Sequence, residues 1–122
     1  MKLVIGGAGQ GKLDYVLAKM GCGLQDVARD PETAKGKPIL DGLEAWVRAH
    51  TDETLDGLLA ANPDVVILCD EVGCGVIPMD KEERVWREAV GRLCCALAAR
   101  AERVERIFCG LPTVLKGDGA WK

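Results

Sequence analysis

The stretch KLVIGGAGQGKLDYVLAKM, residues 2–20, decides the fold. Its first part, residues 2–5, is aliphatic and β-branched, which favours a short strand. A cluster of glycines follows, and glycine is unfavourable inside strands and helices alike. Beyond the cluster, apolar residues recur at helical spacing, namely Leu13, Val16, Leu17 and Met20. The stretch therefore predicts a strand, a loop and a helix in direct succession.

The loop has the spacing G-x-x-x-x-G-K from Gly6 to Lys12, which is typical of a phosphate-binding loop between a strand and a helix. Phosphate oxygens need several converging N–H donors, so such a loop lacks bulky side chains and uses positive φ. The helix N-terminus adds unpaired amides, and Lys12 adds a positive charge for the β and γ phosphates. A bound nucleoside triphosphate is expected to contact Gly6, Gly7, Ala8, Gly9, Gln10, Gly11, Lys12 and Leu13. The alternative is a glycine-rich turn with a solvated lysine.

Acidic residues near this loop are candidates for holding Mg²⁺. The residue after the lysine is Leu13, where the motif normally has a Ser or Thr hydroxyl that binds the ion. Asp41 and Asp70 are each expected at the carboxyl end of a strand, where ligands bind in open α/β sheets, so we expect these two to hold Mg²⁺. Lys12 and Glu71 are the candidate catalytic residues beside them. The alternative is that Asp70 and Glu71 are ordinary solvated charges at a strand end.

The rest of the chain alternates strand and helix patterns. The apolar run VVILC at 65–69 is typical of a strand covered on both faces, and we expect it at the centre of the sheet. The other expected elements are strands at 37–41, 106–110 and 113–116, two short helices or one bent helix within 43–61, and a helix of about 23 residues that begins at Asp80 with a capping box to Glu83. The arginines between 84 and 106 are expected on a solvated helix face.

These elements predict one α/β domain. Strands that alternate with helices, with the most apolar strand inside, favour a P-loop NTPase-like three-layer sandwich with a mostly parallel central sheet. The domain is expected to span residues 1–117, followed by a loose tail at 118–122. Residues 21–38 are expected to form a loop with at most one helical turn, and residues 73–78 a second loop.

The composition excludes several classes of protein. The 122 residues include 16 Lys and Arg against 19 Asp and Glu, a net charge of −3, which disfavours binding to nucleic acid or to a membrane surface. No apolar run is long enough to span a bilayer, and no export signal is evident. The six cysteines form no C-x-x-C pair, so reduced thiols in a cytoplasmic protein are expected. The single histidine, His50, is expected to be solvated.

Several motifs in this order resemble one protein family. After the glycine loop come ILDGLEAWV at 39–47, DEVGCGVIP at 70–78, Trp86-Arg87-Glu88, Gly91-Arg92-Leu93, Gly110 and Leu115-Lys116. Together they resemble the bifunctional adenosylcobinamide kinase/adenosylcobinamide-phosphate guanylyltransferase family of cobalamin biosynthesis. The resemblance covers residues 1–17 and 38–117, and the chain looks like a shortened member of that family.

The resemblance implies binding of GTP or ATP with Mg²⁺ and phosphorylation of the aminopropanol hydroxyl of an adenosylcobinamide-type corrinoid. Under it, Lys12 holds the triphosphate, Asp41 and Asp70 hold Mg²⁺, and Glu71 helps to position the acceptor hydroxyl. The family also forms symmetric trimers, so a homo-oligomer is expected.

This sequence departs from the family pattern for the second activity, guanylyl transfer. In the family, a histidine between the first helix and the segment that matches 39–47 accepts GMP covalently, and residues 18–38 of this chain contain no histidine. The expected reaction is therefore the kinase step, without guanylyl transfer by the covalent route. The alternative is a catalytically degenerate scaffold or regulatory protein that binds a nucleotide or a corrinoid.

Overall fold

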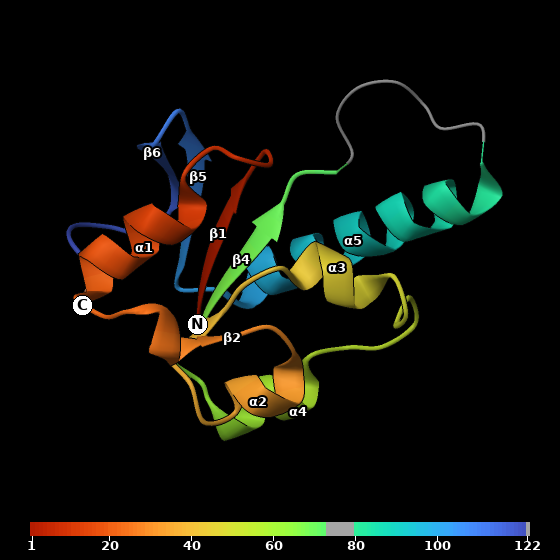
Figure 1. Ribbon diagram of the computed structural model, residues 1–122, viewed down its shortest axis with the longest axis horizontal. Coiled ribbons are helices and arrows are strands. Elements are labelled where there is room, and N and C mark those ends of the chain that lie inside the picture. The colour runs from red at the N-terminus through yellow and green to blue at the C-terminus, as the bar shows by residue number, and fades with distance from the viewer. Residues whose placement is uncertain (73–79, 122) are drawn as a thin grey trace.

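A single six-stranded sheet organises the chain, in the strand order β2-β3-β4-β1-β5-β6 (Figure 1). The computed structural model describes residues 1–72 and 80–121. The four pairings from β2 to β5 are parallel, and β6 is an antiparallel edge strand paired with β5. The strands are β1 (Lys2–Gly6), β2 (Val27–Ala28), β3 (Ile39–Leu40), β4 (Val66–Asp70), β5 (Arg103–Phe108) and β6 (Leu111–Lys116).

Helices cover both faces of this sheet. They are α1 (Lys12–Met20), α2 (Pro31–Ala34), α3 (Leu43–Val47), α4 (Asp56–Ala61) and α5 (Lys81–Arg100), with one 3₁₀ turn at Leu24–Asp26. Alternate residues of a strand point to opposite faces, so Leu3 packs in one apolar cluster with residues of α3, α4 and α5, whereas Val4 packs in a second cluster with Val16 of α1. Figure 1 accordingly shows α1 and α5 on opposite sides of the sheet. The predicted three-layer α/β sandwich with a mostly parallel sheet is confirmed.

The apolar run at 65–69 forms the central part of the sheet, as predicted. Strand β4 lies between β3 and β1, and its residues Ile67 and Leu68 are fully buried and face opposite layers. Because β1, β3 and β4 run in parallel, their carboxyl ends meet at the same edge of the sheet. The glycine loop and the residues directly after β3 and β4 therefore lie at this edge.

Residues 21–38 contain more structure than the sequence pattern predicted. Strand β2 pairs with β3 in this region, and α2 follows it. Asp30 caps that helix, because its Oδ1 accepts a hydrogen bond from the Thr33 amide at 2.9 Å, and Pro31 occupies the first helical position. The prediction was wrong here because elements of two and four residues are too short to show any periodicity.

Three further predictions need correction. Helix α5 has 20 residues, and its cap Asp80 accepts from the Glu82 amide at 2.8 Å, while Glu83 is bonded to Arg48 instead of closing a capping box. Strand β5 begins at Arg103, before the predicted 106–110. Arg103 is only 9% exposed, so it does not lie on a solvated helix face. The predicted loop at 73–78 lies outside the described residues.

The segment after β6, expected to be a loose tail, makes several contacts with the sheet. Trp121 packs edge-to-face on Tyr15 with ring centroids 6.0 Å apart, and its indole N–H donates to the Glu105 carboxylate. The carbonyl of Gly119 accepts from Arg103 at 2.9 Å. Among the residues that the structure describes, no helix combines the length and apolarity required to cross a membrane.

Candidate functional site

The glycine loop connects β1 directly to α1, and the backbone constrains three of its glycines, Gly6, Gly9 and Gly11. A Cβ atom at Gly6 would lie 2.5 Å from the Ile107 carbonyl oxygen of β5, too close for any larger residue. Gly9 has φ +71° and Gly11, which precedes α1, has φ +91°. These are left-handed conformations that glycine adopts without strain. The sequence signal for the loop is therefore matched by its backbone.

Several loop amides have no hydrogen-bond partner among the residues that the structure describes. The N–H groups of Gly9, Gly11, Lys12 and Leu13 donate no hydrogen bond to any other residue of 1–72 or 80–121. The first amides of a helix lack intrahelical acceptors, and the helix dipole places positive charge at the same end. These amides border the N-terminus of the nine-residue α1, which is a favourable position for a phosphate group.

The turn between β5 and β6 is hydrogen-bonded to the glycine loop. Gln10 accepts two hydrogen bonds from this turn, one at its backbone oxygen from the Gly110 amide at 2.8 Å and one at its side-chain Oε1 from the Cys109 amide at 2.7 Å. Cys109 and Gly110 both have positive φ, as in a two-residue hairpin turn of type I′. A ligand would therefore meet a loop that is already ordered by contacts from a distant part of the chain.

Lys12 lies across the mouth of the loop. Its side chain is only 7% exposed, and Nζ donates to the Gly7 carbonyl at 2.9 Å and pairs with Oδ1 of Asp70 at 2.6 Å. Asp70 ends β4, so this ion pair joins the glycine loop to the carboxyl end of the neighbouring strand. A charged group buried to this degree requires such a partner. The lysine and one predicted metal-binding acid are thus in direct contact.

A cavity of about 350 Å³ opens beside this ion pair. Its lining includes both predicted metal-binding acids, and the full set is Gly9, Gly11, Lys12, Leu13, Asp14, Asp41 and Asp70. Glu71 is not among these residues. Its carboxylate binds both Nε and Nη2 of Arg106, at 2.8 and 3.1 Å, and its amide donates to the Gly6 carbonyl. The structure therefore brings Asp41, Asp70 and Lys12 together and places Glu71 at the same edge, held by β5.

Residues that the sequence analysis did not single out surround this cavity. Asp14 lines it directly, one turn into α1. Arg29 forms an ion pair with Asp41 at 2.8 Å. Glu44 of α3 accepts a hydrogen bond from the Asp70 amide at 2.8 Å, which fixes the end of β4. Only Asp14 has a sequence signal, its position in the first turn after the loop; the other two are brought in by pairing between distant segments.

Asp41 and Asp70 are the predicted metal-binding residues that line this cavity. Within the described parts of the chain, no three His, Cys, Asp or Glu side chains converge closely enough to hold a metal by themselves. Mg²⁺ typically binds proteins through one or two carboxylates and completes its shell with water and substrate phosphates. Asp41 and Asp70 can supply those carboxylates, while Leu13 supplies no hydroxyl.

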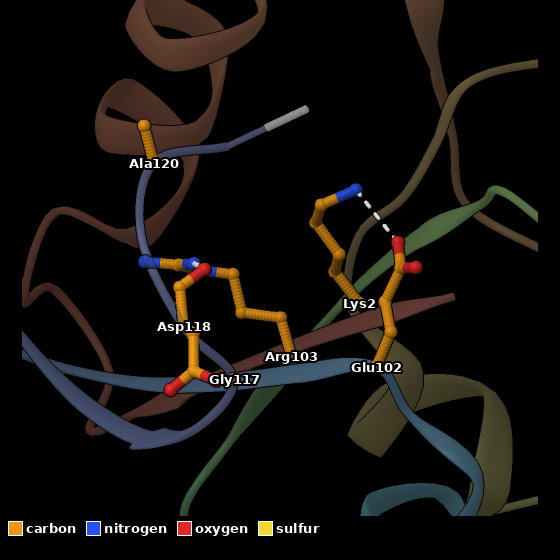
Figure 2. Close-up of a pocket in the computed structure, with 6 residues that line it drawn as sticks. All are labelled: Lys2, Glu102, Arg103, Gly117, Asp118 and Ala120. Atoms are coloured by element: carbon orange, nitrogen blue, oxygen red, sulfur yellow. Dashed lines mark hydrogen bonds and ion pairs between the residues drawn. The ribbon is translucent and has the colours of Figure 1, made fainter.

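A second cavity, of about 250 Å³, lies at the opposite, amino edge of the sheet (Figure 2). Figure 2 shows Lys2 and Glu102 pointing toward each other, and their ion pair measures 3.0 Å. Arg103 reaches instead toward the backbone of 118–119 and is also paired with Glu105. Both cations that line this cavity are paired with protein groups, as Lys12 is, but unlike the glycine-loop cavity none of its described lining residues begins a helix.

His50 and the cysteines lie apart from the candidate site. His50 stacks on Trp46 with ring centroids 4.3 Å apart, is bonded to Glu53 and has a side chain 37% exposed, so it is a surface residue that does not line the cavity. The cysteines of the described residues are free thiols. A hydrogen bond with Cys94, together with burial, raises the pKa of Cys69, which keeps this neighbour of Asp70 as an uncharged thiol.

Comparison with known proteins identifies the family. A family model described as cobinamide kinase / cobinamide phosphate guanyltransferase matches residues 26–115, which include Asp41, Asp70 and Glu71 and begin after the glycine loop. The bifunctional adenosylcobalamin biosynthesis protein CobP of Pseudomonas aeruginosa is 37% identical over 54 residues, or 44% of this chain. The match spans 31% of that relative's own length. The resemblance seen in the sequence is confirmed: the chain belongs to the cobinamide kinase/cobinamide phosphate guanyltransferase family.

Proposed function

We propose that this chain binds GTP or ATP together with Mg²⁺ at the carboxyl edge of the sheet and transfers the terminal phosphoryl group to the hydroxyl of an adenosylcobinamide-type corrinoid. The observation that carries the proposal is the arrangement at the start of α1. Four unpaired backbone amides and the Lys12 ammonium border one cavity there, and two acids at neighbouring strand ends face the same cavity. Family membership supplies the substrate class.

In the proposed mechanism the triphosphate and its Mg²⁺ replace the ion pairs that the charged side chains of the site form with one another. The loop amides and Lys12 bind phosphate oxygens, and Asp41 and Asp70, no longer paired with their cations, would hold Mg²⁺. Mg²⁺, when bound, neutralises charge on the phosphates and fixes their geometry. Since phosphoryl transfer depends mainly on positioning and charge neutralisation, few protein groups are needed.

Glu71 is the proposed contact for the acceptor. Its two hydrogen bonds to Arg106 hold the carboxylate at the same sheet edge as Asp70, and a corrinoid hydroxyl can donate to it there. The hydroxyl oxygen forms a bond to the terminal phosphorus as the bond to the bridging oxygen breaks. The nucleoside diphosphate leaves, and the hydroxyl proton is released to solvent.

A second candidate function is binding without catalysis. Leu13 removes the hydroxyl that normally binds Mg²⁺, and residues 18–38 contain no histidine that could accept GMP. His50 stacks on Trp46 outside the cavity, which does not favour it as a replacement. These departures favour a scaffold or regulatory protein that keeps the nucleotide site. The kinase reading is preferred because the acids and the lysine remain assembled.

Turnover and binding measured on the same preparation distinguish the two functions. Purified protein is incubated with adenosylcobinamide, Mg²⁺ and γ-labelled GTP or ATP, and label transfer to the corrinoid is expected. In parallel, either nucleotide with Mg²⁺ is expected to raise the melting temperature, because a ligand that binds only the folded state stabilises it. Stabilisation without transfer would support the scaffold; absence of both would remove the nucleotide site altogether.

We also propose that the chain associates with copies of itself. Four large apolar side chains are exposed on the β5–β6 hairpin, namely Phe108, Leu111, Val114 and Leu115. Strand β6 is exposed along its whole length and ends the sheet, so its outer edge is open to pairing. Analytical ultracentrifugation is expected to give a mass above that of one 13.1 kDa chain, with a trimer as the form that the family resemblance implies. A monomer at all concentrations would contradict this.

A further inference from the structure

Arg29 is a cation at the edge of the candidate site, and the proposed mechanism gives it no contact with the nucleotide. It follows β2 directly, and Asp41 follows β3. The Asp41 amide donates to the Ala28 carbonyl at 2.9 Å, which keeps the two strand ends together, and Nη1 of Arg29 pairs with Oδ2 of Asp41 at 2.8 Å. Arg29 therefore lies one strand beyond the acid that lines the cavity.

The exposure of this pair is unequal. The Asp41 side chain is 17% exposed and faces the cavity, whereas the Arg29 side chain is 67% exposed. A guanidinium has five N–H donors, and within the described chain this one bonds a carboxylate through Nη1 alone. An exposed ion pair of this kind contributes little to stability, so separating it costs little. Arg29 is consequently free to exchange Asp41 for another anion.

The side chains that line the cavity carry more negative than positive charge. Among the described residues that line the cavity, Lys12 is the one cation, against three carboxylates at Asp14, Asp41 and Asp70. Lys12 is itself paired with Asp70. A triphosphate that enters with Mg²⁺ gives the carboxylates a cation, but its own terminal oxygens then have a single lysine to contact. The guanidinium of Arg29 matches a phosphate well because it can donate two parallel hydrogen bonds.

The strand order indicates which phosphate Arg29 would meet. The loop follows β1, the Lys12–Asp70 pair lies over β4, and Asp41 with Arg29 lies beyond it over β3 and β2. Neighbouring strands are about 4.8 Å apart, so this series runs away from the loop amides across the sheet edge. A triphosphate whose inner phosphates contact the loop and Lys12 extends its terminal group toward Arg29.

We propose that Arg29 is a second phosphate-binding residue. When the nucleotide binds, Arg29 exchanges its contact with Asp41 for a contact with the terminal phosphoryl group. The site is thereby selective for triphosphates over diphosphates. The inference rests on the proposed nucleotide-binding function. Arg29 would then recognise the group to be transferred, from the end of β2 beside Asp41.

The test compares two classes of ligand, triphosphate analogues and diphosphates, on matched variants. Calorimetry measures binding of the β,γ-imido analogues of ATP and GTP, and of ADP and GDP, each with Mg²⁺, to the wild type, Arg29→Gln and Arg29→Lys. Arg29→Gln is expected to weaken binding of the triphosphate analogue about tenfold, because one charge-assisted contact is lost, and to leave diphosphate binding within about twofold. Arg29→Lys is expected to be intermediate. Arg100→Gln, which removes an exposed arginine paired with Asp56, is the control and should change neither affinity.

The possible outcomes distinguish the proposed role of Arg29 from the proposed nucleotide-binding function. Equal loss of triphosphate and diphosphate binding in Arg29→Gln, or no loss of either, overturns the role of Arg29 while the nucleotide site stands. A wild type that binds no nucleotide overturns both. The melting temperature of each variant without ligand shows whether the fold is intact, and little change is expected because the pair is exposed.

Discussion

Replacing Glu105 with Gln should lower the free energy of unfolding by about 3–5 kcal/mol, the usual cost of removing one partner from a buried ion pair. Glu105 is 1% exposed, and its carboxylate accepts hydrogen bonds from Arg103, Tyr15 and the Trp121 indole. Glutamine keeps the size of the side chain but leaves the Arg103 guanidinium, itself 9% exposed, without a counter-charge. The cost arises from that uncompensated charge.

Urea unfolding at pH 7 measures this effect. Glu32→Gln is the matched control, because Glu32 is bonded to Lys35 at 2.9 Å on the surface with a side chain 82% exposed. That variant should lie within about 0.5 kcal/mol of the wild type. If Glu105→Gln were as stable as the control, Glu105 would not be buried with Arg103 and the packing of the C-terminal segment would be wrong.

The same comparison has a definite pH dependence. Burial alone would raise the pKa of Glu105, but hydrogen bonds from Tyr15, Arg103 and Trp121 outweigh burial and lower it below its ordinary value. A group whose pKa is lower in the folded state stabilises the protein above its unfolded pKa, and that contribution is lost as the pH falls through the folded pKa. The stability gap between the wild type and Glu105→Gln should therefore be full at pH 7 and shrink below about pH 4.

Local sequence patterns predicted the part of the candidate site that is continuous in the chain. Strand β1, the glycine loop and α1 follow one another without interruption, and each has its own signal: β-branched residues, glycine spacing and helical periodicity. The positions of Asp41 and Asp70 at strand ends were predictable for the same reason, because each directly follows a short apolar run. Parallel pairing then brings both to the edge where the loop lies.

The partners of these acids could not be predicted from spacing. Arg29 meets Asp41 because β2, a strand of two residues, pairs with β3, and Arg106 meets Glu71 because β5 lies beside β1. Glu105 resembles a surface charge in the sequence, since three of the four residues at 102–104 and 106 are charged. Its burial follows from contacts with Tyr15 and Trp121, which lie 90 and 16 residues away. Such pairings depend on the assembled sheet rather than on any local window.

Replacing Lys12 with Ala should weaken binding of a magnesium–triphosphate complex by about 1.5–3 kcal/mol, the contribution of a hydrogen bond to a charged group. This is a loss of roughly 10- to 150-fold in affinity. Lys12 directly follows the glycine loop, and its ammonium already contacts the Gly7 carbonyl and Asp70. The substitution removes the charge for the inner phosphates and leaves Asp70, 30% exposed, to repel them.

Calorimetry with the β,γ-imido analogues gives the affinity, and Lys35→Ala is the control, because it removes a surface lysine bonded only to Glu32 among the described residues. The control should bind as the wild type does. A melting curve without nucleotide separates loss of binding from loss of fold, since Ala favours the helix that begins at this position. If folded Lys12→Ala protein binds the analogue with wild-type affinity, then the phosphates do not lie at the N-terminus of α1. The acids at the ends of β3 and β4 would then have to serve a ligand bound elsewhere along the sheet edge.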